Sequence, residues 1–112
     1  MSDFGITEGV LHKYRGNDEN VIIPDGVTRI CEDTFFECIT LENVTIPAGV
    51  TQIPMSAFAG CTSLTSVTIP DSVSEIGMFA FSDCGEALII YGKSGSNAEA
   101  YALEEGIEFR CI

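Results

Sequence analysis

The chain has 112 residues and a formal net charge of −12, because 17 Asp and Glu residues face only 5 Lys and Arg residues. Such an acidic surface repels phosphate backbones and anionic lipid headgroups, so we expect neither nucleic acid nor an anionic membrane as a partner. Hydrophobic residues make up 46% of the chain, which favours one folded domain over residues 1–112 rather than disorder.

No targeting or membrane-spanning segment is visible in the sequence. Residues 1–5 lack the basic and apolar regions of a secretory signal, and no apolar run approaches the roughly 20 residues that a spanning helix needs. We therefore expect no membrane insertion, and the residues by themselves leave the localisation unknown.

A β-hairpin is expected near the N-terminus. Residues 4–14 alternate loosely between apolar and polar, and Gly9 marks a turn. Residues 1–20 would then cap the end of the structure that follows, because stacked repeats need their terminal apolar edges covered.

Residues 21–88 hold three consecutive units of 23 residues. A unit this small cannot bury its own apolar face, so the units must stack, with neighbouring strands about 4.8 Å apart. Seven columns keep the spacing: Val21/Val44/Val67, Ile23/Ile46/Ile69, Pro24/Pro47/Pro70, Val27/Val50/Val73, Ile30/Ile53/Ile76, Phe35/Phe58/Phe81 and Cys38/Cys61/Cys84.

Within a unit the pattern predicts two short strands and a closing turn. Residues 41–47 alternate as a strand with one buried face, and Pro47 ends the pairing because it has no N–H. Residues 50–53 form a second extended piece whose apolar side chains point to the core. Residues 57–61 close the coil as a short helical or irregular turn, with Phe58 as the main core side chain.

The C-terminal residues 89–112 are expected to form a strand–helix–strand cap. Residues 88–91 form the first strand, and Ser96-Asn97-Ala98-Glu99 fits a capping box that opens a short helix. Gly106 suits the end of that helix, before a final strand at residues 107–109.

The repeat Leu-x-x-Val-x-Ile-Pro-x-x-Val-x-x-Ile-x-x-x-Ala-Phe-x-x-Cys resembles the BspA-like class of leucine-rich repeat, found in bacterial surface and secreted proteins. The resemblance implies a β-rich solenoid, a leucine-rich-repeat-like right-handed coil with three 23-residue repeats, an N-terminal hairpin cap and a C-terminal strand–helix–strand cap. It also implies adhesion or host-protein binding, and a cell-surface or secreted location rests on the resemblance alone. Among the departures, Cys31 and Pro54 replace the glycine found at Gly77.

The sequence indicates no catalytic, cofactor or metal site. No Cys-x-x-Cys pair occurs, and His12, the only histidine, lacks a nearby nucleophile arrangement. The acidic pairs lack the spacing that wraps a calcium ion. We therefore expect no enzymatic activity, no cofactor and no metal.

The cysteine column Cys38, Cys61 and Cys84 allows two interpretations. In-register stacking brings neighbouring Cα atoms near disulfide distance. We favour three buried, reduced thiols that pack as small hydrophobes, since five cysteines cannot all pair.

One candidate binding surface is a strip on the predicted strand face. Its outward columns are small and polar, and solenoids often bind partners across such strips. The plainer explanation, which we favour, is the β-propensity of threonine. The strip consists of Asn20, Asn43 and Ser66 in one column and Ile22, Thr45 and Thr68 in the other.

A second candidate surface contains Met55, Met78 and Phe79, with Phe36 on a neighbouring turn. Exposed Met and Phe side chains together would mark an adhesive patch. The alternative, which we favour at this stage, is that they fold under the adjacent coil.

The small surface area of the strip limits how tightly it can bind a partner. Three or four short strands present roughly 250–350 Å², whereas a standard partner covers about 800 Å². The sequence thus predicts a non-enzymatic protein-interaction module with an unidentified protein partner. The alternative is a self-associating structural repeat module without a dedicated ligand, which would form a weak homo-oligomer.

Overall fold

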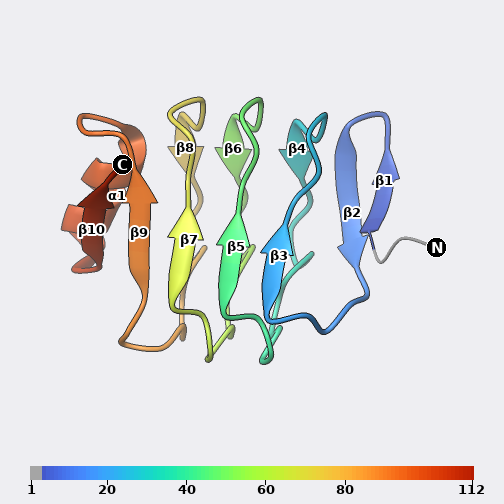
Figure 1. Cartoon of the computed structure of the whole chain (residues 1–112), viewed down its shortest axis with the longest axis horizontal. Coiled ribbons are helices and arrows are strands. Elements are labelled where there is room, and N and C mark those ends of the chain that lie inside the picture. Colours follow the sequence, from blue (N-terminus) through green and yellow to red (C-terminus); the bar gives the residue numbers. More distant parts are fainter. Residues whose placement is uncertain (1–3) are drawn as a thin grey trace.

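The computed structural model describes residues 4–112, which form a β-solenoid of about four turns with one short helix near the C-terminus (Figure 1). The expected solenoid is therefore confirmed, and residues 1–3 of the expected N-terminal cap lie outside the described residues. The elements are β1 (Phe4–Thr7), β2 (Val10–Tyr14), β3 (Asn20–Ile22), β4 (Arg29–Ile30), β5 (Asn43–Thr45), β6 (Gln52–Ile53), β7 (Ser66–Thr68), β8 (Glu75–Ile76), β9 (Ile89–Gly92), α1 (Asn97–Glu105) and β10 (Glu108–Cys111).

The front sheet is parallel and has the strand order β10-β9-β7-β5-β3. Its register follows the 23-residue repeat, since Val21 lies opposite Val44 and Val44 opposite Val67. The back strands form two groups, β1-β2-β4 and β6-β8. For reference, we name three consecutive 23-residue segments coil 1 (residues 20–42), coil 2 (residues 43–65) and coil 3 (residues 66–88).

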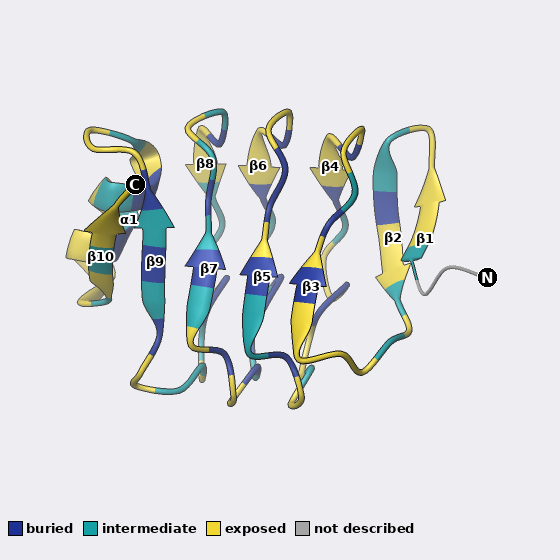
Figure 2. Ribbon diagram, in the orientation of Figure 1, coloured by how far each residue is buried: buried dark blue, intermediate teal, exposed yellow. Residues whose placement is uncertain are grey.

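The core lies between the front sheet and the back strands. The middle residue of β3, β5 and β7 is buried in each case, as the dark bands in Figure 2 show. Val50 and Ile53 also point inward and are almost fully buried, as the repeat predicts. Stacking of the coils therefore places the residues of one repeat column next to one another in the core.

Six aromatic rings run along the inside of the solenoid in one stack. Phe58 is its centre, with ring centroids 5.1 Å from Phe35 and 5.3 Å from Phe81. These rings are nearly parallel, and Phe58 has no exposed surface. The full stack is Phe4, Tyr14, Phe35, Phe58, Phe81 and Tyr101.

Each closing turn is irregular rather than helical, because it contains two residues in the left-handed region. The first position has φ values of 64°, 59° and 62° at Asp33, Ser56 and Phe79. The second has φ values of 55°, 80° and 59° at Glu37, Gly60 and Asp83. Isolated left-handed residues interrupt a right-handed helix, so the chain reverses direction there.

Both ends carry the expected caps. β1 and β2 form an antiparallel hairpin that turns at Gly9, and β2 then pairs with β4. At the other end, Ser96 accepts a hydrogen bond from the Glu99 N–H, and Gly106 ends α1 with a φ of 73°. The Glu99 carboxylate accepts from the N–H of Gly95 at 2.7 Å, one residue earlier than a standard capping box requires.

The back strands of neighbouring coils are hydrogen-bonded at one junction and not at the other. We call the junction of coils 2 and 3 the Gly77 seam, where the Gly77 N–H donates to the Ile53 carbonyl at 2.7 Å. We call the junction of coils 1 and 2 the Pro54 seam, where the equivalent residue is a proline. Pro54 has no N–H to donate to Ile30, and β4 and β6 are not paired.

Candidate interaction surfaces

The strip on the front sheet faces outward, as its sequence pattern predicts. Its first column is bonded to itself: the Asn43 side-chain amide donates to Asn20, and the Ser66 hydroxyl donates to the oxygen of Asn43. A partner that binds these side chains would replace their existing hydrogen bonds with new ones, so little binding energy would be gained. The first column is therefore a weak source of binding energy.

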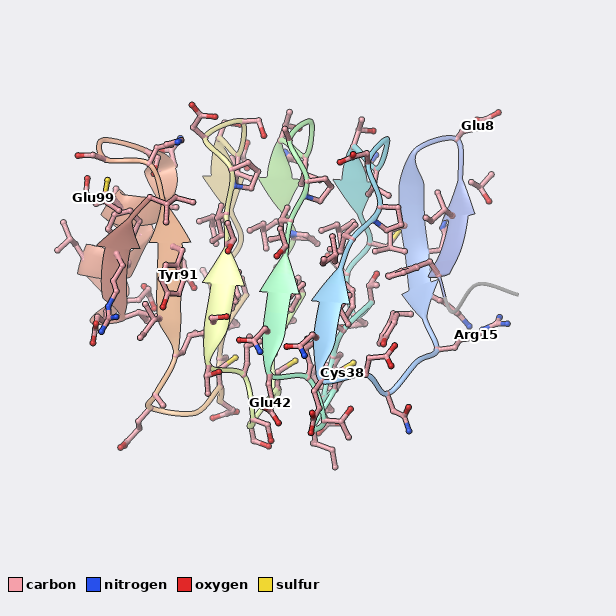
Figure 3. All side chains as sticks on the ribbon, viewed as in Figure 1. Glu8, Arg15, Cys38, Glu42, Tyr91 and Glu99 are labelled. Carbon is pink, nitrogen blue, oxygen red and sulfur yellow. The ribbon has the colours of Figure 1, made fainter. Side chains whose placement is uncertain are left out.

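The second column extends further than the repeats. Thr45 lies beside Thr68, and Thr68 lies beside Tyr91 of β9, which in turn lies beside Arg110 of β10. Figure 3 shows Tyr91 on the outer face of the front sheet. Tyr91 lies 23 residues after Thr68 and so continues the spacing of this column, although the expected strip ended at Thr68. Arg110 belongs to the C-terminal cap, outside the 23-residue pattern.

The side chains of Met55, Met78 and Phe79 are exposed, which makes the favoured expectation wrong. Their exposed fractions are 49%, 66% and 59%, and that of Phe36 is 46%. They do not fold under an adjacent coil because the inward positions of the closing turns are already taken by small alanines and the phenylalanine stack. We name Met55, Met78 and Phe79 the Met/Phe patch.

Phe79 is also strained. It has a φ of 62°, a conformation that costs a residue with a side chain about 1–2 kcal/mol and is unusual for a bulky one. Asp33 and Ser56 occupy the same position in the other coils, and both residue types suit turns better. Phe79 thus gains little from burial and loses stability from its backbone.

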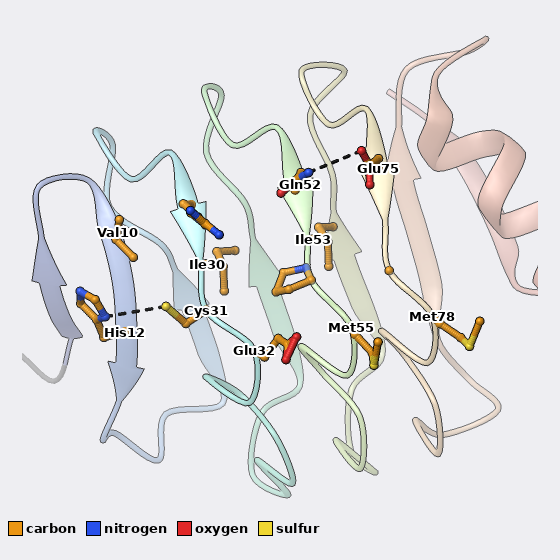
Figure 4. Close-up of a pocket in the computed structure, with 13 residues that line it drawn as sticks. Val10, His12, Ile30, Cys31, Glu32, Gln52, Ile53, Met55, Glu75 and Met78 are labelled. Carbon is orange, nitrogen blue, oxygen red and sulfur yellow. Dashed lines mark hydrogen bonds between the residues drawn. The ribbon is translucent and has the colours of Figure 1, made fainter.

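A groove of about 890 Å³ crosses the back strands (Figure 4). Two rows of repeat-equivalent side chains flank it. The residues between the rows belong to two columns, that of Ile30 and Ile53 and that of Cys31, Pro54 and Gly77. The first row is Glu32, Met55 and Met78, and the second is Arg29, Gln52 and Glu75. Gln52 donates from its amide to the Glu75 carboxylate at 3.5 Å.

Sequence reasoning missed this groove, although a signal for it was present. Pro54 is the departure from the glycine found at Gly77, and it lies where the ladder of the back strands is interrupted. A proline in a strand column indicates a local edge. Of the six side chains in the two flanking rows, four were outside the candidate set: Arg29, Glu32, Gln52 and Glu75.

The cysteine column is less buried than expected. Cys61 is buried, but Cys38 and Cys84 are only partly buried. All three thiols are free. Cys61 donates to the Phe35 carbonyl at 3.0 Å, and Cys84 donates to the Phe58 carbonyl at 3.2 Å.

These thiols differ in acidity. Interaction with the Cys38 thiol raises the pKa of Cys61, and burial raises it further. The same interaction lowers the pKa of Cys38. Burial raises the pKa of Cys84 to about 11. Cys61 and Cys84 are therefore protonated at neutral pH, as structural thiols are.

A further polar contact lies at the end of the groove nearest the N-terminal hairpin. The Cys31 sulfur lies 3.7 Å from Nδ1 of His12 at one end of the groove. Within residues 4–112, no group of three or more His, Cys, Asp or Glu side chains is arranged to hold a metal ion. Across the same described residues, no helix has the length and apolar character that a bilayer crossing requires.

Comparison with known proteins agrees with the repeat pattern. A family model described as a BspA-type leucine-rich repeat region of six copies matches residues 11–105. A crystal structure of a leucine-rich repeat protein from T. pallidum is similar, with 22% identity and a TM-score of 0.46 over 79% of this chain and 67% of that chain. A search of curated proteins found no match.

Proposed function

Because the chain belongs to the BspA-type leucine-rich repeat family, we propose that it is a protein-interaction module that contacts its partner through the Met/Phe patch. Leucine-rich repeat solenoids typically act as interaction scaffolds rather than as enzymes. Bacterial adhesion, or binding of a host protein, is the form of this activity that the family suggests, together with a cell-surface or secreted location.

The observation that carries the proposal is the exposure of Met55, Met78 and Phe79. Each is between 49% and 66% exposed, in a fold whose valine and phenylalanine columns are buried. Exposed apolar side chains that meet across neighbouring coils contribute to association rather than to folding. Methionine adapts its flexible side chain to varied partners.

The strip on the front sheet is the weaker candidate surface. Asn43 and Ser66 already bond to neighbouring side chains, and Thr45 and Thr68 offer only short hydroxyl groups. Its area of roughly 250–350 Å² also falls short of the usual contribution of a partner, about 800 Å².

Site-specific photo-cross-linking tests the proposal. A photoreactive phenylalanine analogue at position 79 is compared with the same group at position 45, in the cells that produce the protein. We expect protein adducts from position 79 and few from position 45. The absence of adducts from position 79, or stronger adducts from position 45, contradicts the assignment of the patch.

The second candidate function, self-association, is supported by the ends of the front sheet. Among the described strands, β3 and β10 each pair on one side only, so their outer edges are open to another chain. The net charge of −12 opposes close approach of two copies. Light scattering over a range of concentrations and salt tests this candidate, and a constant monomer mass contradicts it.

A further inference from the structure

We infer that the groove over the Pro54 seam binds an extended peptide segment of a partner protein, in which Lys or Arg flanks an apolar residue. This inference rests on the proposed interaction function and names the chemistry of its ligand. The groove and the Met/Phe patch share Met55 and Met78, so one partner can occupy both surfaces.

The dimensions of the groove suit an extended segment. The two flanking rows cross three coils, at about 4.8 Å per step, so a ligand spans about 10 Å between the first and last coils. An extended chain covers that distance with three or four residues at about 3.3 Å each. A volume of about 890 Å³ leaves room for their side chains.

The apolar part of the ligand is set by Met55, Met78 and the ring of Pro54. Met55 and Met78 lie in one row of the groove and are 49% and 66% exposed. Covering them removes apolar surface from water at no cost to the core. The partner segment therefore needs an apolar side chain over coils 2 and 3.

Hydrogen-bond acceptors that line the groove determine which polar group the ligand needs. Glu32 and Glu75 line the groove beside the methionines, and Gln52 occupies only one oxygen of Glu75. The Ile30 carbonyl lacks the backbone donor that Ile53 receives from Gly77. Carboxylates and carbonyls together favour a cationic side chain with several N–H donors.

The positive charge of Arg29 lies at the other end of the groove. Arg29 and Glu32 belong to coil 1, whereas Glu75 and Met78 belong to coil 3. A cation is therefore favoured near Glu75 and beside the apolar residue. The net charge of −12 adds long-range attraction for a basic segment and repels an acidic one.

Three synthetic peptides test the inference by NMR titration of the ¹⁵N-labelled chain. The first alternates lysine and leucine over eight residues, the second replaces lysine by glutamate, and the third replaces leucine by serine. We expect the lysine–leucine peptide to bind at least fivefold more tightly than either control. Its largest shifts should lie at Glu32, Gln52 and Met78.

Paired variants locate the contact. Met78→Gln should weaken binding of the lysine–leucine peptide at least threefold, whereas Leu103→Gln, at an even more exposed side chain of α1, should leave it unchanged. Glu75→Gln should weaken it about twofold relative to Glu104→Gln. Equal effects within each pair, or equal affinity for the lysine–serine peptide, overturn the inference and leave only general attraction to an acidic surface.

The outcomes separate this inference from the proposed function. Adducts from position 79 without peptide binding in the groove retain the interaction module and reject the ligand chemistry. Groove binding without adducts supports the ligand chemistry and rejects the Met/Phe patch as the contact used in cells.

Discussion

The two seams between the three coils have the same front sheet but different backs. On the front, β3 pairs with β5 and β5 with β7 in the same register. At the back, the Gly77 seam is closed by paired strands, whereas the Pro54 seam has none. The column that holds glycine in one coil and proline in another accounts for one missing bond. The Pro54 seam also lacks bonds to Thr28 like those that Ser74 and Glu75 donate to Thr51.

The closing turns show the same difference. Ser56, Phe58 and Gly60 each donate a backbone hydrogen bond to coil 3, while of the equivalent residues of coil 1 only Glu37 donates to coil 2. Each such bond contributes about 0.5–1.5 kcal/mol net. The Pro54 seam is therefore the weaker junction, and the groove crosses it.

The largest expected effect comes from the residue that supports both seams. Phe58→Ala removes a fully buried ring stacked on Phe35 and Phe81, and should lower the free energy of unfolding by about 3–5 kcal/mol. Urea denaturation measures the change. The control Phe36→Ala removes a ring that is 46% exposed and should lower it by less than about 1 kcal/mol. Equal losses would show that the ring stack does not form the core.

Gly77→Ala should break the closed seam. A Cβ at position 77 would collide with the backbone nitrogen of Met55 and lie 2.8 Å from the carbonyl carbon of Pro54. Because both contacts are backbone, the coils must separate, and we expect a loss of about 1–3 kcal/mol. Gly5→Ala is the control, since its Cβ would meet only ordinary contacts near 3.7 Å. An unchanged urea midpoint for Gly77→Ala contradicts the closed seam.

Alkaline pH should weaken the packing of the closing turns. The pKa of Cys84 is raised from 9.0 to about 11, so the folded state holds the thiol proton more tightly than the unfolded chain. Its stabilising effect is complete below pH 9 and is lost as the pH rises through 11. Urea midpoints between pH 7 and 11 should fall less steeply in Cys84→Ser than in Cys111→Ser. Identical profiles would exclude Cys84 as the cause.

Phe79→Asn should stabilise the chain slightly, because asparagine tolerates a φ of 62° better than phenylalanine does. We expect a gain of about 1 kcal/mol in thermal or urea unfolding. Phe36→Asn, at a position without positive φ, should give no gain. A loss of stability in Phe79→Asn would mean that the ring packs more than its 59% exposure indicates.

The smallest change in stability is expected from Pro54→Gly, which should convert the open seam into a copy of the Gly77 seam. The new N–H gains a bond to Ile30 worth about 0.5–1.5 kcal/mol, while the flexible glycine costs a similar amount through the unfolded chain. Hydrogen exchange gives the clearer measurement. The amide of Gln52 should exchange at least tenfold more slowly, and unchanged exchange would show that the proline does not hold the seam open.

Much of the core and both caps could be predicted from the residues themselves. Val44, Phe58 and Ile53 recur every 23 residues because stacked coils share one geometry, so spacing alone identifies inward positions. The capping box at Ser96 and the glycine at Gly106 are local signals, and local signals identify the helix. Thr45 and Thr68 face outward for the same periodic reason.

The stacking, the register and the polarity of each column follow from the order of the residues, because these properties depend on periodicity and on short-range turn chemistry. Which surfaces remain open follows only from the folded arrangement of the coils. The exposure of Met78 and Phe79 depends on the space left in the turns by Ala80 and Phe81, and the groove depends on a hydrogen bond that Pro54 cannot donate to Ile30. Both are contacts between coils, and a periodic pattern assigns the same contacts to every coil.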